Sequence, residues 1–123
     1  MTMRVDTRPR NRNAGRPKEK SIVGYLQWLR GRSCACEGRN HDCGGGKIQA
    51  AHGPHKASKG VGTKVADRWA MPLSVNCHMA QHRMGWPSFA GLYLRGREPL
   101  DVCEAYFIAW LRTPMGVKWR RAQ

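Results

Sequence analysis

The chain has 123 residues, enough for one domain with a modest hydrophobic core. Its formal net charge of +14 comes from 22 Lys and Arg residues against 8 Asp and Glu residues, so we expect a polyanionic partner. No apolar run approaches the roughly 18 residues of a membrane-spanning helix, and no signal peptide is recognisable. The composition therefore excludes membrane-spanning and secreted classes and predicts a cytoplasmic protein.

The first 20 residues form a basic segment. Seven Lys and Arg residues accompany two acidic residues and almost no apolar side chains. Such a segment cannot bury enough surface to offset its ordering entropy, so we expect a disordered basic arm over residues 1–20. The arm could lie along DNA phosphates or act only as a solubilising tail, and both alternatives stay open.

Short apolar patterns separated by turn residues follow the arm. Apolar residues at helical spacing predict a packing helix from Ser21, its expected N-cap, to Gly31. Glycine, asparagine and aspartate then indicate a loop. The next expected elements are a short strand at 47–52, a Gly- and Lys-rich loop at 53–67, a second strand at 68–75 and a helix at 76–86.

The C-terminal part predicts two more helices. A short amphipathic helix follows Pro87, and Pro99 opens a second packing helix that Pro114 ends. Residues 114–123 are a basic tail. Cys103 lies on the apolar stripe of the last helix and is expected in the core. Six aromatic residues are likewise expected in the core rather than as stacking platforms for bases: Trp28, Trp69, Trp86, Phe89, Phe107 and Trp110.

Cysteines and histidines gather in the middle of the chain. The number of cysteines is odd, five, which argues against a disulfide framework, and three of them crowd into the ten residues 34–43. Reduced thiols clustered in this way indicate zinc. His78 and His82 lie four residues apart, so on a helix they share one face and can converge on one ion. A solvated helix face is the usual explanation of such a pair, but the preceding Cys77, the upstream His52 and the positive charge favour a metal.

The order of these elements resembles the ββα-metal core of the HNH (His-Me finger) endonucleases. Within that family the chain is similar to small phage and prophage proteins, including the recombination-associated Ref-like group. The similar stretches are "AAH" at 50–52, "KGVGTKVAD" at 59–67, "MPLSVNCHMAQH" at 71–82 and "HRMGWPSF" at 82–89. The resemblance covers roughly residues 34–90, and implies an α+β nuclease domain at 21–113 whose ββα core lies between flanking helices.

The resemblance also implies roles for individual residues. His52 matches the general base that activates water, and His78 and His82 match the helix ligands of a catalytic ion, magnesium or manganese, with zinc also acceptable to imidazole. Asp67 lies near the family's Asp or Asn, which orients the base or joins the metal shell.

The chain departs from the family at two places. Arg68 and Trp69 occupy positions where an Asn is expected. Ala51 stands where many members have an Asp or His ligand, so the ion would need another donor, such as Asp67, His55 or water. We would then expect the site to bind its ion more weakly than the sites of those members do.

A structural zinc is a second implication, because many HNH proteins hold their core with two cysteine pairs. The matching thiols here are Cys34, Cys36, Cys43 and Cys77, which would form a tetrahedral site. Ser74 stands where the first cysteine of the second pair would be. The C-x-C spacing is tighter than the usual C-x-x-C, so His41 is an alternative to Cys36 as fourth ligand.

The sequence therefore predicts a metal-dependent DNA endonuclease of phage or prophage origin. Its expected phosphate contacts are Lys59, Lys64, Arg68 and Arg83. The alternative is a non-catalytic, zinc-stabilised DNA-binding module that assists recombination or packaging, and a basic RNA-packing protein is a third. Sequence specificity and any recombinase partner cannot be read from a basic surface, because such a surface contacts phosphates rather than bases.

Overall fold

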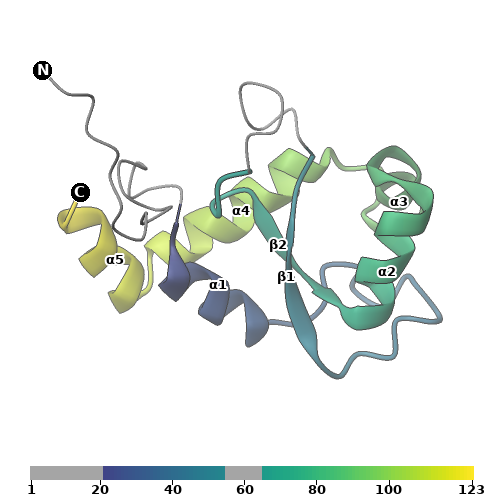
Figure 1. The fold of residues 1–123 in the computed structure, drawn as a ribbon, viewed down its shortest axis with the longest axis horizontal. Helices are drawn as coiled ribbons and strands as arrows, with labels where there is room; N and C mark the ends of the chain where they lie inside the picture. Colours follow the sequence, from purple (N-terminus) through teal and green to yellow (C-terminus); the bar gives the residue numbers. More distant parts are fainter. Residues whose placement is uncertain (1–20, 55–64) are drawn as a thin grey trace, which may run out of the picture.

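The structure is a computed structural model that describes residues 21–54 and 65–123. The predicted basic arm, His55, Lys59 and Lys64 lie outside these residues. The described chain contains five helices and one two-stranded antiparallel sheet, which confirms the predicted α+β class (Figure 1). The elements are α1 (Val23–Arg30), β1 (Ile48–His52), β2 (Ala70–Ser74), α2 (Val75–Met84), α3 (Trp86–Tyr93), α4 (Pro99–Leu111) and α5 (Pro114–Arg121).

The sheet is small, and neighbouring parts of the chain pack against it or bond to it. Ile48 pairs with Ser74 at one end of the sheet, and His52 pairs with Ala70 at the other. All five residues of β2 are buried. The backbone N–H of Ala35 donates to the carbonyl oxygen of Pro72 at 2.8 Å, so the loop before β1 is hydrogen-bonded to β2. A hairpin alone is marginally stable in water, and this one depends on the helices around it.

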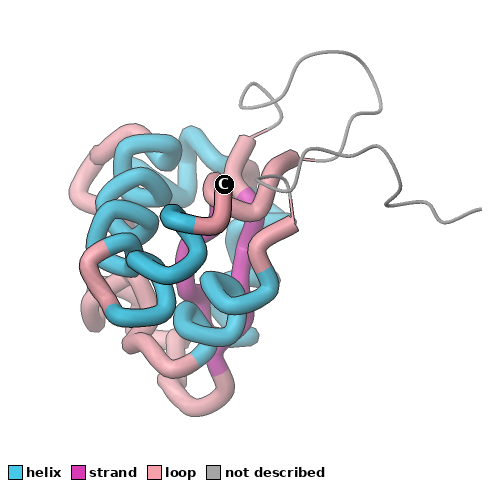
Figure 2. The backbone as a smooth tube through the Cα atoms, turned by 90° about the vertical axis from the view of Figure 1, so that its left-hand side faces the viewer, coloured by secondary structure: helices cyan, strands magenta, loops and turns pink. Residues whose placement is uncertain are grey.

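The helices divide the core into two clusters. In Figure 1, α2 and α3 lie to the right of the sheet and α1 and α5 to the left, while α4 runs behind the strands. The side view in Figure 2 shows the strands next to each other with helical segments around them. Cys103 is fully buried, as predicted. Buried members of the cluster nearest α2 include Ala51, Met71, Leu73, Phe89 and Val102, and the cluster at α1 comprises Ile22, Tyr25, Leu29, Ala70, Phe107 and Trp110.

Helix length bears on membrane insertion. The longest described helix, α4, has 13 residues. Within residues 21–54 and 65–123, no helix has both the length and the apolar character needed to cross a bilayer.

The start of α1 differs from the prediction. Ser21 was the expected N-cap, but the helix begins at Val23, with Ile22 in the cap position and no side-chain cap bond. The N–H of Ile22 instead donates to Asp67 Oδ2 at 2.8 Å, across 45 residues of sequence. A distant buried carboxylate therefore satisfies a backbone donor at the start of this helix.

The basic C-terminal tail is a packed helix. Thr113 caps α5 by accepting the N–H of Gly116 at 3.1 Å. The ring of Trp119 lies 5.7 Å from that of Trp110 and 5.9 Å from that of Phe107, measured between centroids. These contacts hold α5 against the end of α4.

Gly116 gives a test of this packing. A Cβ at residue 116 would collide with the carbonyl oxygen of Trp110 and lie 2.7 Å from the Cα of Leu111. We expect Gly116→Ala to lower the free energy of unfolding by about 1–3 kcal/mol, because backbone must move to admit the methyl group. Urea unfolding followed by tryptophan fluorescence measures the change.

Gly91→Ala is the matched control. Gly91 is exposed in α3, with no heavy atom within 4 Å of an added Cβ. The same substitution there should be neutral or stabilise by up to about 1 kcal/mol, since alanine is the better helix former. Equal effects at both sites would contradict the packing of α5 described above.

Candidate functional site

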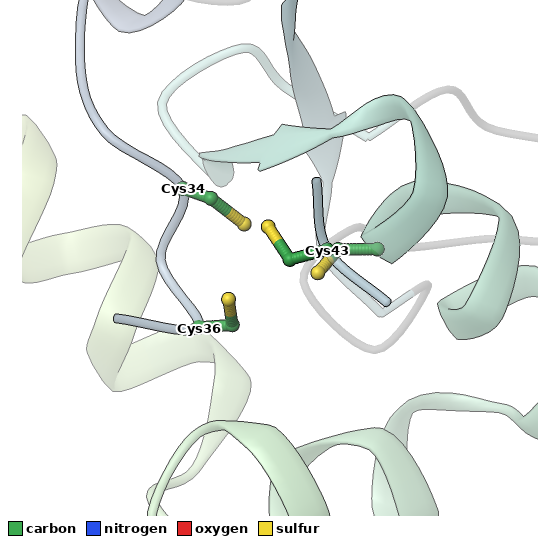
Figure 3. A group of neighbouring side chains, drawn as sticks. Cys34, Cys36 and Cys43 are labelled. Carbon is green, nitrogen blue, oxygen red and sulfur yellow. The ribbon is translucent and has the colours of Figure 1, made fainter. Parts of the chain in front are cut away.

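Four thiols from separate parts of the chain come together beside β2 and α2. The Sγ atoms of the four cysteines all lie within 4.8 Å of one another. Figure 3 shows the sulfurs of Cys34, Cys36 and Cys43 pointing toward a common centre. Sulfurs bound to a tetrahedral zinc lie about 3.8 Å apart, so a slight contraction would complete such a site. The group Cys34, Cys36, Cys43 and Cys77 could therefore hold a metal ion such as zinc.

The positions of the two side chains favour Cys36 over His41 as the fourth ligand. Cys36 is fully buried within the thiol group. His41 is exposed, and its side chain is not part of the group. The tight C-x-C spacing therefore does not prevent both of its cysteines from facing the same centre.

Hydrogen-bond donors surround the sulfurs. The side-chain amide of Asn40 donates to Cys77 Sγ at 3.2 Å, and the backbone N–H of Ser74 donates to Cys34 Sγ at 3.3 Å. The hydroxyl oxygen of Ser74 lies 3.1 Å from Cys43 Sγ. Donors aimed at sulfur stabilise the thiolate form, which is the form that binds metals.

The thiols differ in acidity. Burial raises the pKa of Cys77 and that of Cys34. Burial also acts on Cys43, but hydrogen bonds from the Ser74 hydroxyl and the Gly45 backbone outweigh it and lower the pKa of Cys43 to about 7. Cys43 is therefore the most readily ionised of these three thiols near neutral pH, and a cation would be needed to ionise the buried ones.

A second candidate site is a cavity of about 620 Å³ that we call the histidine cavity. It contains all three histidines singled out in the sequence, which come from β1 and α2. These side chains therefore face one space. The residues lining it are Ala50, His52, Gly53, Pro54, Val65, His78, Gln81, His82, Trp86 and Pro87.

The two helix histidines are in direct contact. Their Nε2 atoms lie 3.2 Å apart and their ring centroids 4.8 Å apart. His78 Nδ1 lies 2.7 Å from Gln49 Oε1, an acceptor, so Nδ1 carries the proton and Nε2 keeps its lone pair. Burial, and after it the charges of His82 and His52, lower the pKa of His78. The neutral, metal-binding form of His78 is thereby favoured.

Gln49 was missed by the sequence analysis. It lies on β1 and reaches a histidine 29 residues further along the chain. No spacing rule identifies such a partner, because the contact exists only once α2 packs against the strand.

His52 is held by a buried carboxylate. Its Nε2 lies 2.9 Å from Asp67 Oδ1, and the other oxygen of Asp67 accepts the N–H of Ile22. Asp67 is only 5% exposed. A carboxylate accepts hydrogen bonds, so Nε2 of a neutral His52 carries the proton and Nδ1 is left as the acceptor. The carboxylate of Asp67 thus fixes the orientation of the His52 ring.

Two of the predicted phosphate contacts, Arg68 and Arg83, lie within the described residues. The guanidinium of Arg68 packs on the rings of Trp69 and Phe107, at 4.7 and 5.0 Å from their centroids. Arg83 is exposed on α2 and lines a separate cavity of about 320 Å³ with Asn40 and other residues. Among the described residues, neither arginine lines the histidine cavity, and their contact with phosphate stays a prediction.

The thiol group gives a metal-removal test. We expect about one zinc ion per purified chain, lost in Cys36→Ser because a hydroxyl is a poor ligand for zinc. His41→Ala should keep its zinc, since the ring lies outside the thiol group. Elemental analysis together with thermal unfolding measures both, and the zinc-free chain should melt at a lower temperature. Zinc retained in Cys36→Ser and lost in His41→Ala would reverse the ligand assignment.

The lowered pKa of His78 gives a pH test. The folded state favours the neutral ring, whereas the unfolded chain binds a proton near the ordinary pKa of 6.5. The contribution of His78 to stability is therefore present above pH 6.5 and is lost as the pH falls below it. We expect the free energy of unfolding to decline more steeply between about pH 7 and pH 5 in the wild type than in His78→Gln.

Urea titrations at several pH values give these free energies. His41→Gln, which removes an exposed imidazole outside the cavity, is the control. Parallel pH profiles of the wild type and His78→Gln would show that the ring is not held neutral by its surroundings.

One protein family matches the chain. It is described as "Protein of unknown function (DUF968)", and the match covers residues 1–87, which include the four thiols and all three cavity histidines. No curated protein and no solved structure matches the chain. Because the match spans well over half of its length, the chain belongs to the DUF968 family.

Proposed function

We propose that the chain is a metal-dependent HNH-type DNA endonuclease, of phage or prophage origin, that hydrolyses phosphodiester bonds. The observation that carries the proposal is the histidine cavity, where His52 and its Asp67 partner share one space with the contacting pair His78 and His82. In this proposal β1, β2 and α2 form the ββα-metal core.

The helix histidines fit a single divalent ion. Ligand nitrogens about 2.1 Å from an ion are about 3.0 Å apart in an octahedral site and about 3.4 Å apart in a tetrahedral one. The 3.2 Å between the Nε2 atoms of His78 and His82 falls between these values. Gln49 fixes the ring of His78 from behind, as hydrogen-bond acceptors commonly do for metal-bound histidines. Two neutral imidazoles favour manganese or zinc over magnesium.

His52 is suited to act as the general base. Its Nδ1 is the free acceptor and can take a proton from the attacking water, while Asp67 stabilises the imidazolium that results. A bound divalent ion would supply positive charge next to the scissile phosphate and the leaving 3′ oxygen. In this proposal His52 accepts the proton of the attacking water, and His78 and His82 would hold the divalent ion.

We also propose that the four thiols bind a structural zinc. The sheet has only two strands, and a metal-bound thiol group is a common means of stabilising so small a domain. The donors at Ser74 and Asn40 would remain as hydrogen bonds to the bound thiolates. DNA is the proposed partner because of the net charge of +14.

A non-catalytic DNA-binding module is the second candidate. Ala51 is fully buried among apolar neighbours and offers no ligand where many HNH proteins have one. Among the described residues, the proposed ion then has only His78 and His82 as side-chain ligands, because Asp67 is committed to His52 and Ile22. An ion held by two side chains would bind weakly, and this expectation supports the non-catalytic candidate.

Plasmid nicking tests the proposal. We expect the wild type to nick supercoiled DNA with manganese, and more slowly with magnesium. His52→Ala should reduce the rate by about 10²- to 10⁴-fold, the usual contribution of a general base. His41 is an exposed histidine outside the cavity, so His41→Ala should leave the rate unchanged.

Asp67→Asn tests positioning in the same assay. The amide oxygen of an asparagine can still accept the N–H of Ile22, but its NH₂ group would meet His52 and reverse the tautomer. We expect a lower rate with little change in melting temperature. If His52→Ala nicks DNA at the wild-type rate, the assignment of His52 as the general base is wrong. If the wild type nicks no DNA with any divalent ion, the result favours the DNA-binding module.

A further inference from the structure

A further cavity, of about 310 Å³, lies beside the histidine cavity, and we call it the second cavity. Three residues, Pro54, Trp86 and Pro87, line both cavities, so the two spaces share a wall. The proposed chemistry uses none of these three residues. The residues lining the second cavity are Pro54, Trp86, Pro87, Ala90, Gly91, Gly96, Arg97, Glu98 and Pro99.

The walls of the second cavity are mostly flat and apolar. Trp86 is partly exposed, and the edge-to-face contact of its ring with buried Phe89, at 5.9 Å, fixes its orientation. Gly91 and Gly96 present no side chains. Arg97 supplies a cation, with 43% of its side chain exposed; its Nε donates to the carbonyl oxygen of Leu94 at 3.0 Å, and its guanidinium lies 3.6 Å from a carboxylate oxygen of Glu37.

We propose that this second cavity binds an unpaired base of the DNA strand whose phosphate lies at the histidines. The inference rests on the proposed function and names its substrate class. A cavity near the lower limit of ligand-site volumes suits one flat ring system rather than a longer ligand. An indole accepts the face of any base, and Arg97 complements the adjoining phosphate. The shared wall places the base next to the proposed site of cleavage.

The proposal predicts a preference between DNA forms. A base inside an intact duplex must leave its stack before it can lie against Trp86, whereas a base in a single strand or a distorted duplex is already available. The preferred substrate is therefore single-stranded DNA, or duplex DNA with an unpaired nucleotide near the cleaved bond.

Binding without cleavage tests this inference. Fluorescence anisotropy would compare a labelled single-stranded oligonucleotide with the same sequence as a duplex, using the full chain without added divalent ions. We expect the single strand to bind more tightly. Trp86→Leu should weaken that binding by about 5- to 100-fold, the range found for the loss of one stacked base, and change duplex binding by less than about twofold.

Gly91→Leu fills the cavity without removing the indole. Space is open around Gly91, and leucine is favourable in a helix, so this variant should fold normally. It should reproduce the effect of Trp86→Leu. Trp28→Leu is the matched control, because Trp28 is also partly buried but lies on α1 and lines neither cavity; its binding should equal that of the wild type.

The possible failures are distinguishable. Wild-type affinity for single strands in both Trp86→Leu and Gly91→Leu would overturn the base-binding cavity, whatever the nicking assay shows. Equal affinity of the wild type for single strand and duplex would also overturn it. Binding that depends on Trp86, in a chain that nicks no DNA, would support the cavity and reject the nuclease.

Discussion

The position of both candidate sites depends on how strand β2 passes into helix α2 at Ser74. Its hydroxyl oxygen accepts the N–H of Cys77 at 3.1 Å, which starts the helix, and its backbone N–H donates to Cys34 Sγ. The same hydroxyl lies 3.1 Å from Cys43 Sγ. A helix cap alone contributes about 1 kcal/mol. Here the residue that caps the helix at Cys77 also contacts the sulfurs of Cys34 and Cys43, so Ser74 joins the start of α2 to the thiol group.

Helix α2 serves both sites at once. Cys77 and His78 are consecutive, and consecutive residues point about 100° apart around a helix, so one faces the thiols while the other faces the histidine cavity. A metal at the thiols would therefore fix the helix that carries His78 and His82 without touching the cavity. This coupling matters because the sheet has only two strands and cannot hold the helix by itself.

Local patterns predicted much of this arrangement, and long-range contacts explain what was missed. Apolar periodicity and the prolines located the four predicted helices to within a few residues, and spacing alone put His78 and His82 on one helix face. The bond from Ile22 to Asp67 and the contact of Gln49 with His78 join residues 45 and 29 positions apart, so no local pattern contains them. Arg68 shows the same limit: a cation is expected at the surface, but two aromatic rings that only the fold brings near it hold its guanidinium.

The two candidate functions make different demands on Asp67. As an anchor for α1 the carboxylate uses its bond to Ile22, but an apolar residue at position 52 would take the hydrogen bond of His52 away from the buried Oδ1 and would destabilise the fold. Placing an imidazole against that buried carboxylate adds a polar pair whose desolvation offsets much of its attraction, so the pair is weak support for stability. What the pair does provide is a fixed tautomer, with Nδ1 of His52 left as an acceptor in the cavity it shares with two further imidazoles. The proposed hydrolysis depends on that arrangement, whereas DNA binding through a basic surface does not.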